Sequence, residues 1–265
     1  MQKSILRTLK TWWGDWATAV AIIVASVLIG KIPPPQVRFS LDDPAINYPH
    51  MEKEKISTLL VASISLAIPL LVVTLVSVRH SSFIIFHHGF LGLLSSGSIT
   101  LFFVNLTKVS LGELRPDWIA RCKPIMGAAR VLTSDSCKQT DLSLLRDGQK
   151  SFMSGHAGAS FAGFFFLSLF LATQLGVLST RRSIFRAALV LAPLAFPLWV
   201  SISRITDYRH HPHDVIAGAI TGILAASVSY FIYSPTSSEE SPFEELELNV
   251  IDARAMPLDN ISIKP

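Results

Sequence analysis

The sequence predicts an all-α fold, an integral membrane bundle of six transmembrane helices. Half of the 265 residues are hydrophobic, 16% are charged, and the mean hydropathy is +0.45. A soluble domain carries roughly 25% charged residues. A few long apolar stretches contain almost no charged residues. A helix of about 20 mostly apolar residues is long enough to cross the hydrocarbon core of a bilayer. These observations exclude an ordinary soluble globule, a disulfide-dense secreted module and a mainly disordered chain.

The first apolar stretch, Trp12–Gly30, follows three basic residues, which is also how a secretory signal sequence begins. A small-residue cleavage site is hard to place before the segment Lys31–Pro35. We therefore expect a retained transmembrane helix.

Five further stretches complete the set of six. They are Ile56–Val78, Phe83–Leu106, Ala157–Thr180, Ala187–Ile202 and Val215–Tyr233. Pro193 and Pro197 interrupt the fifth span, because proline cannot donate a helical hydrogen bond. Glycine and alanine recur in the sixth span and suit close helix packing.

An even number of spans places both termini on one side of the membrane. Basic residues precede the first span and separate the fourth from the fifth, so the positive-inside rule favours cytoplasmic termini. Residues 234–265 carry seven acidic and two basic side chains, a charge of −5, and we expect a disordered, cytoplasmic acidic tail. Residues 1–233 then form one membrane domain of charge +9, since the whole chain carries +4.

The charge of the membrane domain favours an anionic partner, either lipid headgroups or a phosphorylated substrate. Nucleic acid is a poor partner, because the basic residues lie between apolar spans rather than on a solvated face. The two cysteines, Cys122 and Cys137, can form one disulfide if their loop lies in an oxidising compartment. The sequence does not predict the oligomeric state.

Three polar clusters interrupt the apolar chain, and all fall on the same predicted side of the membrane. They are Lys108–Pro116, Ser151–His156, and Ser203–Arg204 followed by His210 and Asp214. If the first cluster is helical, its lysine and arginine are two turns apart and point the same way. His210 and Asp214 are four residues apart, so one helical turn can hold the carboxylate against the imidazole. These clusters place a catalytic site at one membrane interface.

The clusters contain what phosphoryl transfer requires, namely fixed cations and donors around a phosphate that stays negative in the transition state. Lys108, Arg115 and Arg204 supply positive charge, and Ser154 and the backbone of Gly155 supply donors. A neutral imidazole oriented by a carboxylate can act at phosphorus, and a second histidine can protonate the departing alcohol. No carboxylate cluster for Mg²⁺ is visible, so we expect neither a metal nor another cofactor.

The three clusters resemble the motifs of the type 2 phosphatidic acid phosphatase (PAP2) family, K-x6-R-P, P-S-G-H and S-R-x5-H-x3-D. Their order, spacing and placement among six helices match between Lys108 and Asp214. The stretches Arg115–Cys122 and Asp207–His211 look especially like fungal lipid phosphate phosphatases, including diacylglycerol pyrophosphate phosphatases.

This resemblance implies a role for each matched position. His210 is expected to be the nucleophile that forms a phosphohistidine, with Asp214 as its orienting partner and His156 as the acid that protonates the lipid alcohol. The phosphate is expected to be bound by Lys108, Arg115, Ser154, Gly155 and Arg204. The resemblance further implies metal-independent hydrolysis of phosphatidic acid, diacylglycerol pyrophosphate and lysophosphatidic acid. It places the active site on the lumenal side of an endomembrane or vacuolar membrane.

Two further expectations concern Met153, in the second cluster, and the two cysteines, which lie between the first and second clusters. Met153 stands where the family has proline, and we expect only a modest loosening of the loop. If the segment is lumenal, a bridge between Cys122 and Cys137 contributes about 3 kcal/mol in the chain-entropy model.

Less specific interpretations remain for several polar residues. Basic residues beside spans are usually interfacial anchors. His211 and His213 match no pattern and are expected to be interfacial, and Glu113 and Asp207 are expected on a solvated face. Asp214 follows Pro212 and can cap the last helix as well as orient His210.

Rival functions also follow from the sequence. Within the enzymes, the chain can be a polyprenyl pyrophosphate phosphatase or a lipid phosphotransferase. Outside them, it can be a lipid transporter or an inactive lipid-binding relative. A transporter is expected to carry polar residues at mid-membrane, whereas these spans are nearly free of charge. His156, His210 and Asp214 are all present, which argues against an inactive relative.

Overall fold

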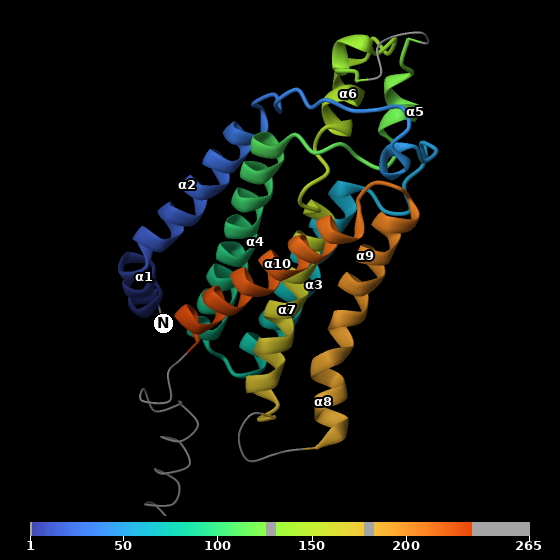
Figure 1. Cartoon of the computed structure of the whole chain (residues 1–265). Helices are drawn as coiled ribbons and strands as arrows, with labels where there is room; N and C mark the ends of the chain where they lie inside the picture. Colours follow the sequence, from blue (N-terminus) through green and yellow to red (C-terminus); the bar gives the residue numbers. More distant parts are fainter. Residues whose placement is uncertain (1, 126–130, 178–182, 235–265) are drawn as a thin grey trace, which may run out of the picture. The chain divides into compact units, whose positions relative to one another are not determined.

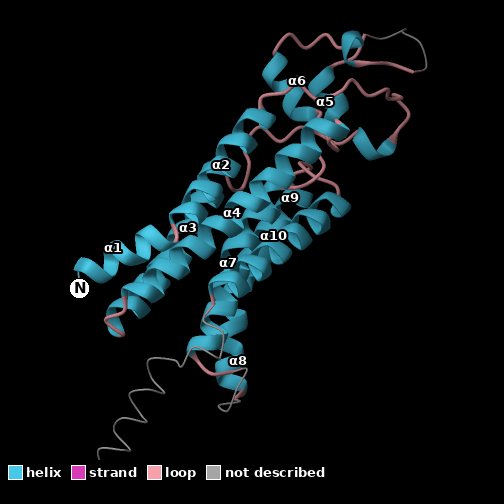
Figure 2. Cartoon of the chain, turned by 90° about the vertical axis from the view of Figure 1, so that its left-hand side faces the viewer, coloured by secondary structure: helices cyan, strands magenta, loops and turns pink. Residues whose placement is uncertain are grey.

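A computed structural model of the chain describes residues 2–125, 131–177 and 183–234. In this part the regular elements are all helical, with two isolated β-bridges and no strand (Figure 2). Six helices within it are long and apolar enough to span a membrane, which confirms the predicted fold class. They are α2 (Trp13–Gly30), α3 (Thr58–Arg79), α4 (Phe83–Leu111), α7 (Gly155–Gln174), the combined run Ile184–Thr206 and α10 (Pro212–Tyr233).

Short elements fill the connections. A helix α1 (Gln2–Thr11) precedes α2, and the loops contain η1 (Pro44–Ile46), α5 (Trp118–Cys122), η2 (Ser134–Ser136) and α6 (Leu142–Gly148). The fifth span was predicted at Ala187–Ile202 and is longer at both ends. It consists of α8 (Ile184–Leu191), a 3₁₀ turn η3 (Ala192–Leu194) and α9 (Ala195–Thr206). The 3₁₀ turn contains Pro193, which cannot donate to the preceding turn.

The observed ends of two other helices differ from the predicted ends because of capping residues. α7 begins two residues before the predicted start because Ser154 Oγ accepts the N–H of Ala157. The helix ends at Gln174, and the predicted end, Thr180, lies outside the described residues. α4 continues past the predicted Leu106 and stops at Gly112, whose φ of +64° is the left-handed conformation that ends many helices.

The end of α4 corrects one expectation about the first cluster. Lys108 lies in the last helical turn, whereas Arg115 lies in the loop beyond Gly112. The two residues therefore do not share one helical face, and any cooperation between them depends on tertiary structure.

Close backbone contact joins α7 to α10 (Figure 1). A Cβ at Gly222 would lie 2.4 Å from the carbonyl oxygen of Gly158, and one at Gly218 would lie 2.4 Å from that of Ser154. Only glycine permits this approach, which is a common use of small residues between membrane helices. The first turns of α7 and α10, which carry His156 and Asp214, are thereby packed together.

The loops 31–57 and 112–154, described except for 126–130, form a cap over one end of the bundle, at the top of Figure 1. Phe39 and Leu132 exchange backbone hydrogen bonds, and Cys122 is joined to Cys137 by a disulfide with a Cα–Cα distance of 4.7 Å. A small apolar core lies beneath, made of Phe39, Ile46, Leu114, Trp118, Cys122, Leu132 and Leu145. The cap fixes the loops that leave α4 and enter α7. Of the predicted acidic tail, residues 235–265 lie outside the described residues.

Candidate active site

Four helix ends converge beneath the cap and bring the three polar clusters together. These are the C-terminal ends of α4 and α9 and the N-terminal ends of α7 and α10 (Figure 1). α1 and the last turns of α10 lie at the opposite end of the bundle. The clusters, up to about a hundred residues apart in sequence, therefore form one site at one end of the spanning helices.

The centre of the site is a buried imidazole beside a buried carboxylate. His210 and Asp214 are 2% and 0% exposed, and His210 Nδ1 lies 3.5 Å from Asp214 Oδ2. Asp214 Oδ2 also accepts the hydroxyl of Ser151 at 2.6 Å and the backbone N–H of His211 at 2.8 Å. The last bond caps the start of α10, so the same carboxylate caps this helix and contacts His210.

Burial favours the neutral form of the His210 imidazole. Burial lowers the pKa of His210 to about 3, and the nearby charges of Arg115 and Lys108 act in the same direction, while Asp214 opposes them. A neutral imidazole keeps a lone pair on one ring nitrogen, which a nucleophile or a base requires.

A second histidine faces the same site from α7. His156 Nε2 lies 3.5 Å from Arg204 Nη1, and the carbonyl oxygen of Arg204 accepts the backbone N–H of His210 at 3.3 Å. Arg204 is fully buried, and it donates to Ser203 Oγ at 3.1 Å and to Asp207 Oδ2 at 3.2 Å. Arg204 thus contacts both His156 and His210, and the structure brings these three predicted site residues together.

Lys108 approaches from α4 at the glycine that precedes His156. Its Nζ lies 3.7 Å from the position that a Cβ on Gly155 would take. The neighbouring Ser154 donates its backbone N–H to the carbonyl oxygen of Asp214 at 3.0 Å, and its hydroxyl caps α7. Met153, at the place of the family proline, is buried, and its sulfur accepts the hydroxyl of Thr221 at 3.2 Å.

Arg115 is oriented by a carboxylate that the sequence did not indicate. Its Nε and Nη2 donate to the backbone oxygen and to Oδ1 of Asp147, both at 2.8 Å. Asp147 Oδ2 accepts Arg121 Nη1 at 2.8 Å, and Arg121 in turn contacts Asp117. Burial opposes ionisation of Asp147, but Arg115 and Arg121 outweigh it and hold the pKa of Asp147 at about 2. The carboxylate therefore remains charged at neutral pH and fixes both guanidinium groups.

Asp207 corrects a prediction. It was expected on a solvated face, but it is 1% exposed and binds Arg204, the backbone N–H of Lys55 at 2.9 Å and Lys55 Nζ at 3.2 Å. Glu54 was missed altogether. Its Oε2 accepts Arg204 Nη1 at 2.7 Å and lies 3.9 Å from His156 Nε2, and its Oε1 lies 3.2 Å from Arg209 Nη2. No motif marks Glu54, because it comes 150 residues before its arginine partner.

Three residues at the rim of the site, together with the buried Asp214, could hold a metal ion. One ligand atom each from Glu113, His211, His213 and Asp214 lies within 4.8 Å of the others. His213 Nε2 is 2.7 Å from Glu113 Oε1 and 3.2 Å from Asp214 Oδ1. Two imidazoles and two carboxylates form a donor set that suits zinc. His211 and His213 are therefore part of the site's surroundings, beyond the interfacial role that was expected.

The fold and the site together define a polytopic membrane protein with a buried histidine–aspartate pair and fixed cations at one end of the bundle. The family described as the PAP2 superfamily matches residues 89–237, which is more than half of the chain. The chain therefore belongs to the PAP2 superfamily.

Curated relatives support the same assignment over most of the chain. A probable diacylglycerol pyrophosphate phosphatase 1 of Schizosaccharomyces pombe is 33% identical over 236 residues, covering 86% of this chain and 84% of the relative. Diacylglycerol pyrophosphate phosphatase 1 of Saccharomyces cerevisiae is 31% identical, with 79% and 75% covered. Lipid phosphate phosphatase 2 of Arabidopsis thaliana is 32% identical, with 83% and 77% covered. No solved structure was found to match.

Proposed function

We propose that this protein is a metal-independent lipid phosphate phosphatase that hydrolyses phosphatidic acid, and also diacylglycerol pyrophosphate and lysophosphatidic acid. The observation that carries the proposal is the buried His210 beside Asp214, with Arg204 in contact with both His156 and His210. The names of the relatives supply the substrate class.

In the first step, the lone pair of His210 attacks phosphorus. Nδ1 faces Asp214, which leaves Nε2 as the attacking nitrogen and lets the carboxylate stabilise the positive charge that develops on the ring. The N–P bond forms while the P–O bond to the lipid breaks. His156, which the negative charge of the bound phosphate holds in its protonated form, gives its proton to the departing oxygen, so that diacylglycerol leaves as an alcohol.

In the second step, water attacks the phosphohistidine. Neutral His156 takes a proton from this water, the N–P bond breaks, and inorganic phosphate is released while His210 regains its lone pair. The two histidines return to their initial protonation states, and the net reaction consumes one water.

Charge on the phosphate oxygens is stabilised by groups that the fold holds in place. Arg204, Lys108 and Arg115 supply the cations, and both guanidinium groups are anchored by carboxylates before substrate arrives. Preorganised charge of this kind is usually the largest contribution to catalysis. Ser154 caps α7 and Gly155 is its first residue, and the helix dipole favours an anion at this N-terminus.

The topology forms part of the same proposal. Disulfides persist in oxidising compartments, so the Cys122–Cys137 bridge supports a lumenal position for the cap and for the site beneath it. Residues 1–233 are then the phosphatase domain of an endomembrane or vacuolar protein, with both termini and the acidic tail 234–265 in the cytoplasm.

Substitution of the two histidines tests the mechanism. His210→Ala removes the nucleophile and should lower phosphate release from phosphatidic acid by about 10⁴-fold or more. His156→Ala removes the general acid and should lower it by roughly 10²–10⁴-fold. His80→Ala, at the far end of α3, is the matched control and should stay within about twofold of wild type. Near-wild-type activity of His210→Ala would reject the assigned nucleophile.

Chelation tests metal independence, and the Glu113–His211–His213–Asp214 group makes the test necessary. Activity measured with excess EDTA should equal the untreated activity, and orthovanadate should inhibit, because cationic side chains supply the charge neutralisation. His213→Ala, which removes one potential ligand, should leave kcat within about threefold of wild type. Complete loss of activity on chelation, with recovery on adding Zn²⁺ or Mg²⁺, would contradict metal independence.

A further inference from the structure

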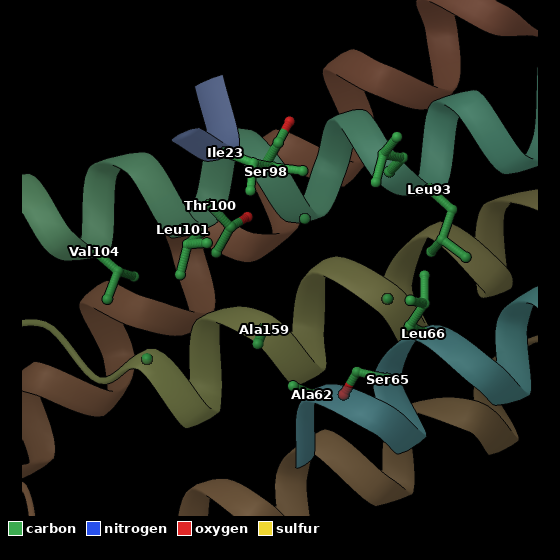
Figure 3. Close-up of a pocket in the computed structure, with 14 residues that line it drawn as sticks. Ile23, Ala62, Ser65, Leu66, Leu93, Ser98, Thr100, Leu101, Val104 and Ala159 are labelled. Carbon is green, nitrogen blue, oxygen red and sulfur yellow. The ribbon is translucent and has the colours of Figure 1, made fainter. Parts of the chain in front are cut away.

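A long apolar groove runs from the site into the membrane-spanning part of the bundle. Its volume is about 290 Å³, and its walls come from α2, α3, α4 and α7 (Figure 3). Figure 3 shows Val104 and Leu101 of α4 towards one end, and Leu93 of α4 with Leu66 of α3 at the other. Gly155, the residue before His156, also lines it.

The walls of this groove expose little polarity. Ser98 Oγ donates to the carbonyl oxygen of Ser95 at 2.9 Å, and Thr100 Oγ1 donates to that of Ser96 at 2.8 Å, so both hydroxyls are satisfied within α4. The third hydroxyl of the lining, Ser65 Oγ of α3, is buried and has no hydrogen-bond partner among the described residues. A groove of this kind, inside a membrane bundle, suits a hydrocarbon chain rather than a polar ligand.

The length of the groove matches one leaflet of a bilayer. Val104 and Leu93 are eleven residues apart on α4, about 16 Å at the rise of an α-helix. Half of a hydrocarbon core is about 15 Å. The upper end lies one helical turn below Lys108, whose Nζ approaches Gly155. A lipid with its phosphate at Lys108 therefore has a chain of the right length in the groove.

We infer that this groove is the binding subsite for one acyl chain of the phosphorylated lipid, an inference that rests on the proposed function. Surrounding lipid is as apolar as the groove, so the groove gains little from the hydrophobic effect. Its role is to orient the lipid so that the phosphorus is aligned with His210, and a misplacement of about 1 Å can cost about 10²-fold in rate.

Gly97 offers a way to block the groove without disturbing the packing. It lines the groove seven residues below Val104, and a Cβ added there meets no atom of the described residues within 4 Å beyond its own helical turn and chain neighbours. A leucine at this position can therefore enter the lower groove. Gly14 of α2 has equally open surroundings but does not line the groove, so Gly14→Leu is the matched control.

The experiment compares kcat/KM for dioleoyl and dioctanoyl phosphatidic acid in mixed micelles. Gly97→Leu should lower the value for the dioleoyl lipid by about 10- to 100-fold and leave the dioctanoyl value within about twofold, because the short chain ends above the obstruction. Gly14→Leu should match wild type on both. Equal losses on both lipids, or no loss on the dioleoyl lipid, would overturn the inference.

A binding readout separates this inference from the proposed function. A phosphatidic acid with a photoreactive group near the end of one chain should crosslink to α2, α3, α4 or α7 in the wild type, and Gly97→Leu should abolish these adducts. If the wild type hydrolysed neither lipid, the proposed function would fail, and the crosslinks alone would decide for or against the groove. Adducts confined to other helices would overturn the subsite.

A second inference comes from Glu54, whose carboxylate lies where a substrate phosphate is expected. It contacts Arg204 at 2.7 Å and Arg209 at 3.2 Å, and it lies 3.9 Å from His156. Arg204 does not need this carboxylate in order to be buried, because Asp207 and Ser203 already accept its Nη2 and Nε.

The backbone around Glu54 is anchored, while its side chain is partly exposed. Arg209 holds the carbonyl oxygen of Met51 at 2.8 Å, and Asp207 holds the N–H of Lys55 at 2.9 Å. The Glu54 side chain is 29% exposed, so it can turn outward without unfolding the loop. The geometry points to Glu54 as an internal anion that a phosphate must displace, and hence as a residue that weakens phosphate and product binding.

Binding of inorganic phosphate, measured by titration calorimetry, tests this role without turnover. Glu54→Gln keeps the size of the side chain and removes its charge, so the Kd for phosphate should fall by about tenfold. Glu52→Gln removes the same charge two residues away and should change the Kd by less than about twofold. A Kd that rises in Glu54→Gln would show that Glu54 positions Arg204 instead, and an unchanged Kd or no binding to either protein would equally overturn the inference.

Discussion

The buried carboxylate of Asp214 holds the site together. It lies against the imidazole of His210, accepts the hydroxyl of Ser151 and caps α10 through the N–H of His211, while its backbone oxygen accepts the N–H of Ser154. A buried charge is tolerated only when its hydrogen bonds are made. The same bonds that stabilise the carboxylate therefore fix the register between α7 and α10, which the glycine contacts make possible.

The cations of the site follow one rule, since each buried guanidinium has a carboxylate partner. Arg204 pairs with Asp207, Arg115 with Asp147, and Arg121 with Asp117 and Asp147. Taking charges out of water is costly, and removing one member of such a pair costs more than the pair contributes. These carboxylates hold the cations in position before substrate arrives, and the contact of Glu54 with Arg204 is the one that a phosphate is proposed to replace.

The sequence was sufficient to predict the six spans and the three clusters, because apolar runs and motif spacing are local properties. Helix ends depended on caps such as Ser154 and Gly112, which shifted boundaries by several residues. Glu54 and Asp147 could not be predicted, since each meets its arginine only through tertiary packing. Asp207 was placed wrongly for a related reason, because the sequence did not show that the loop before α3 covers it.

The measurement that tests the central claim most directly is trapping of a covalent intermediate. Protein mixed with phosphatidic acid labelled in its phosphate, quenched within milliseconds and digested under alkaline conditions, should yield one labelled peptide. The label should be acid-labile, lie on His210, and build up further in His156→Ala if that residue also activates water. An acid-stable label, or a label on another residue, would contradict the proposed nucleophile and with it the account of the site.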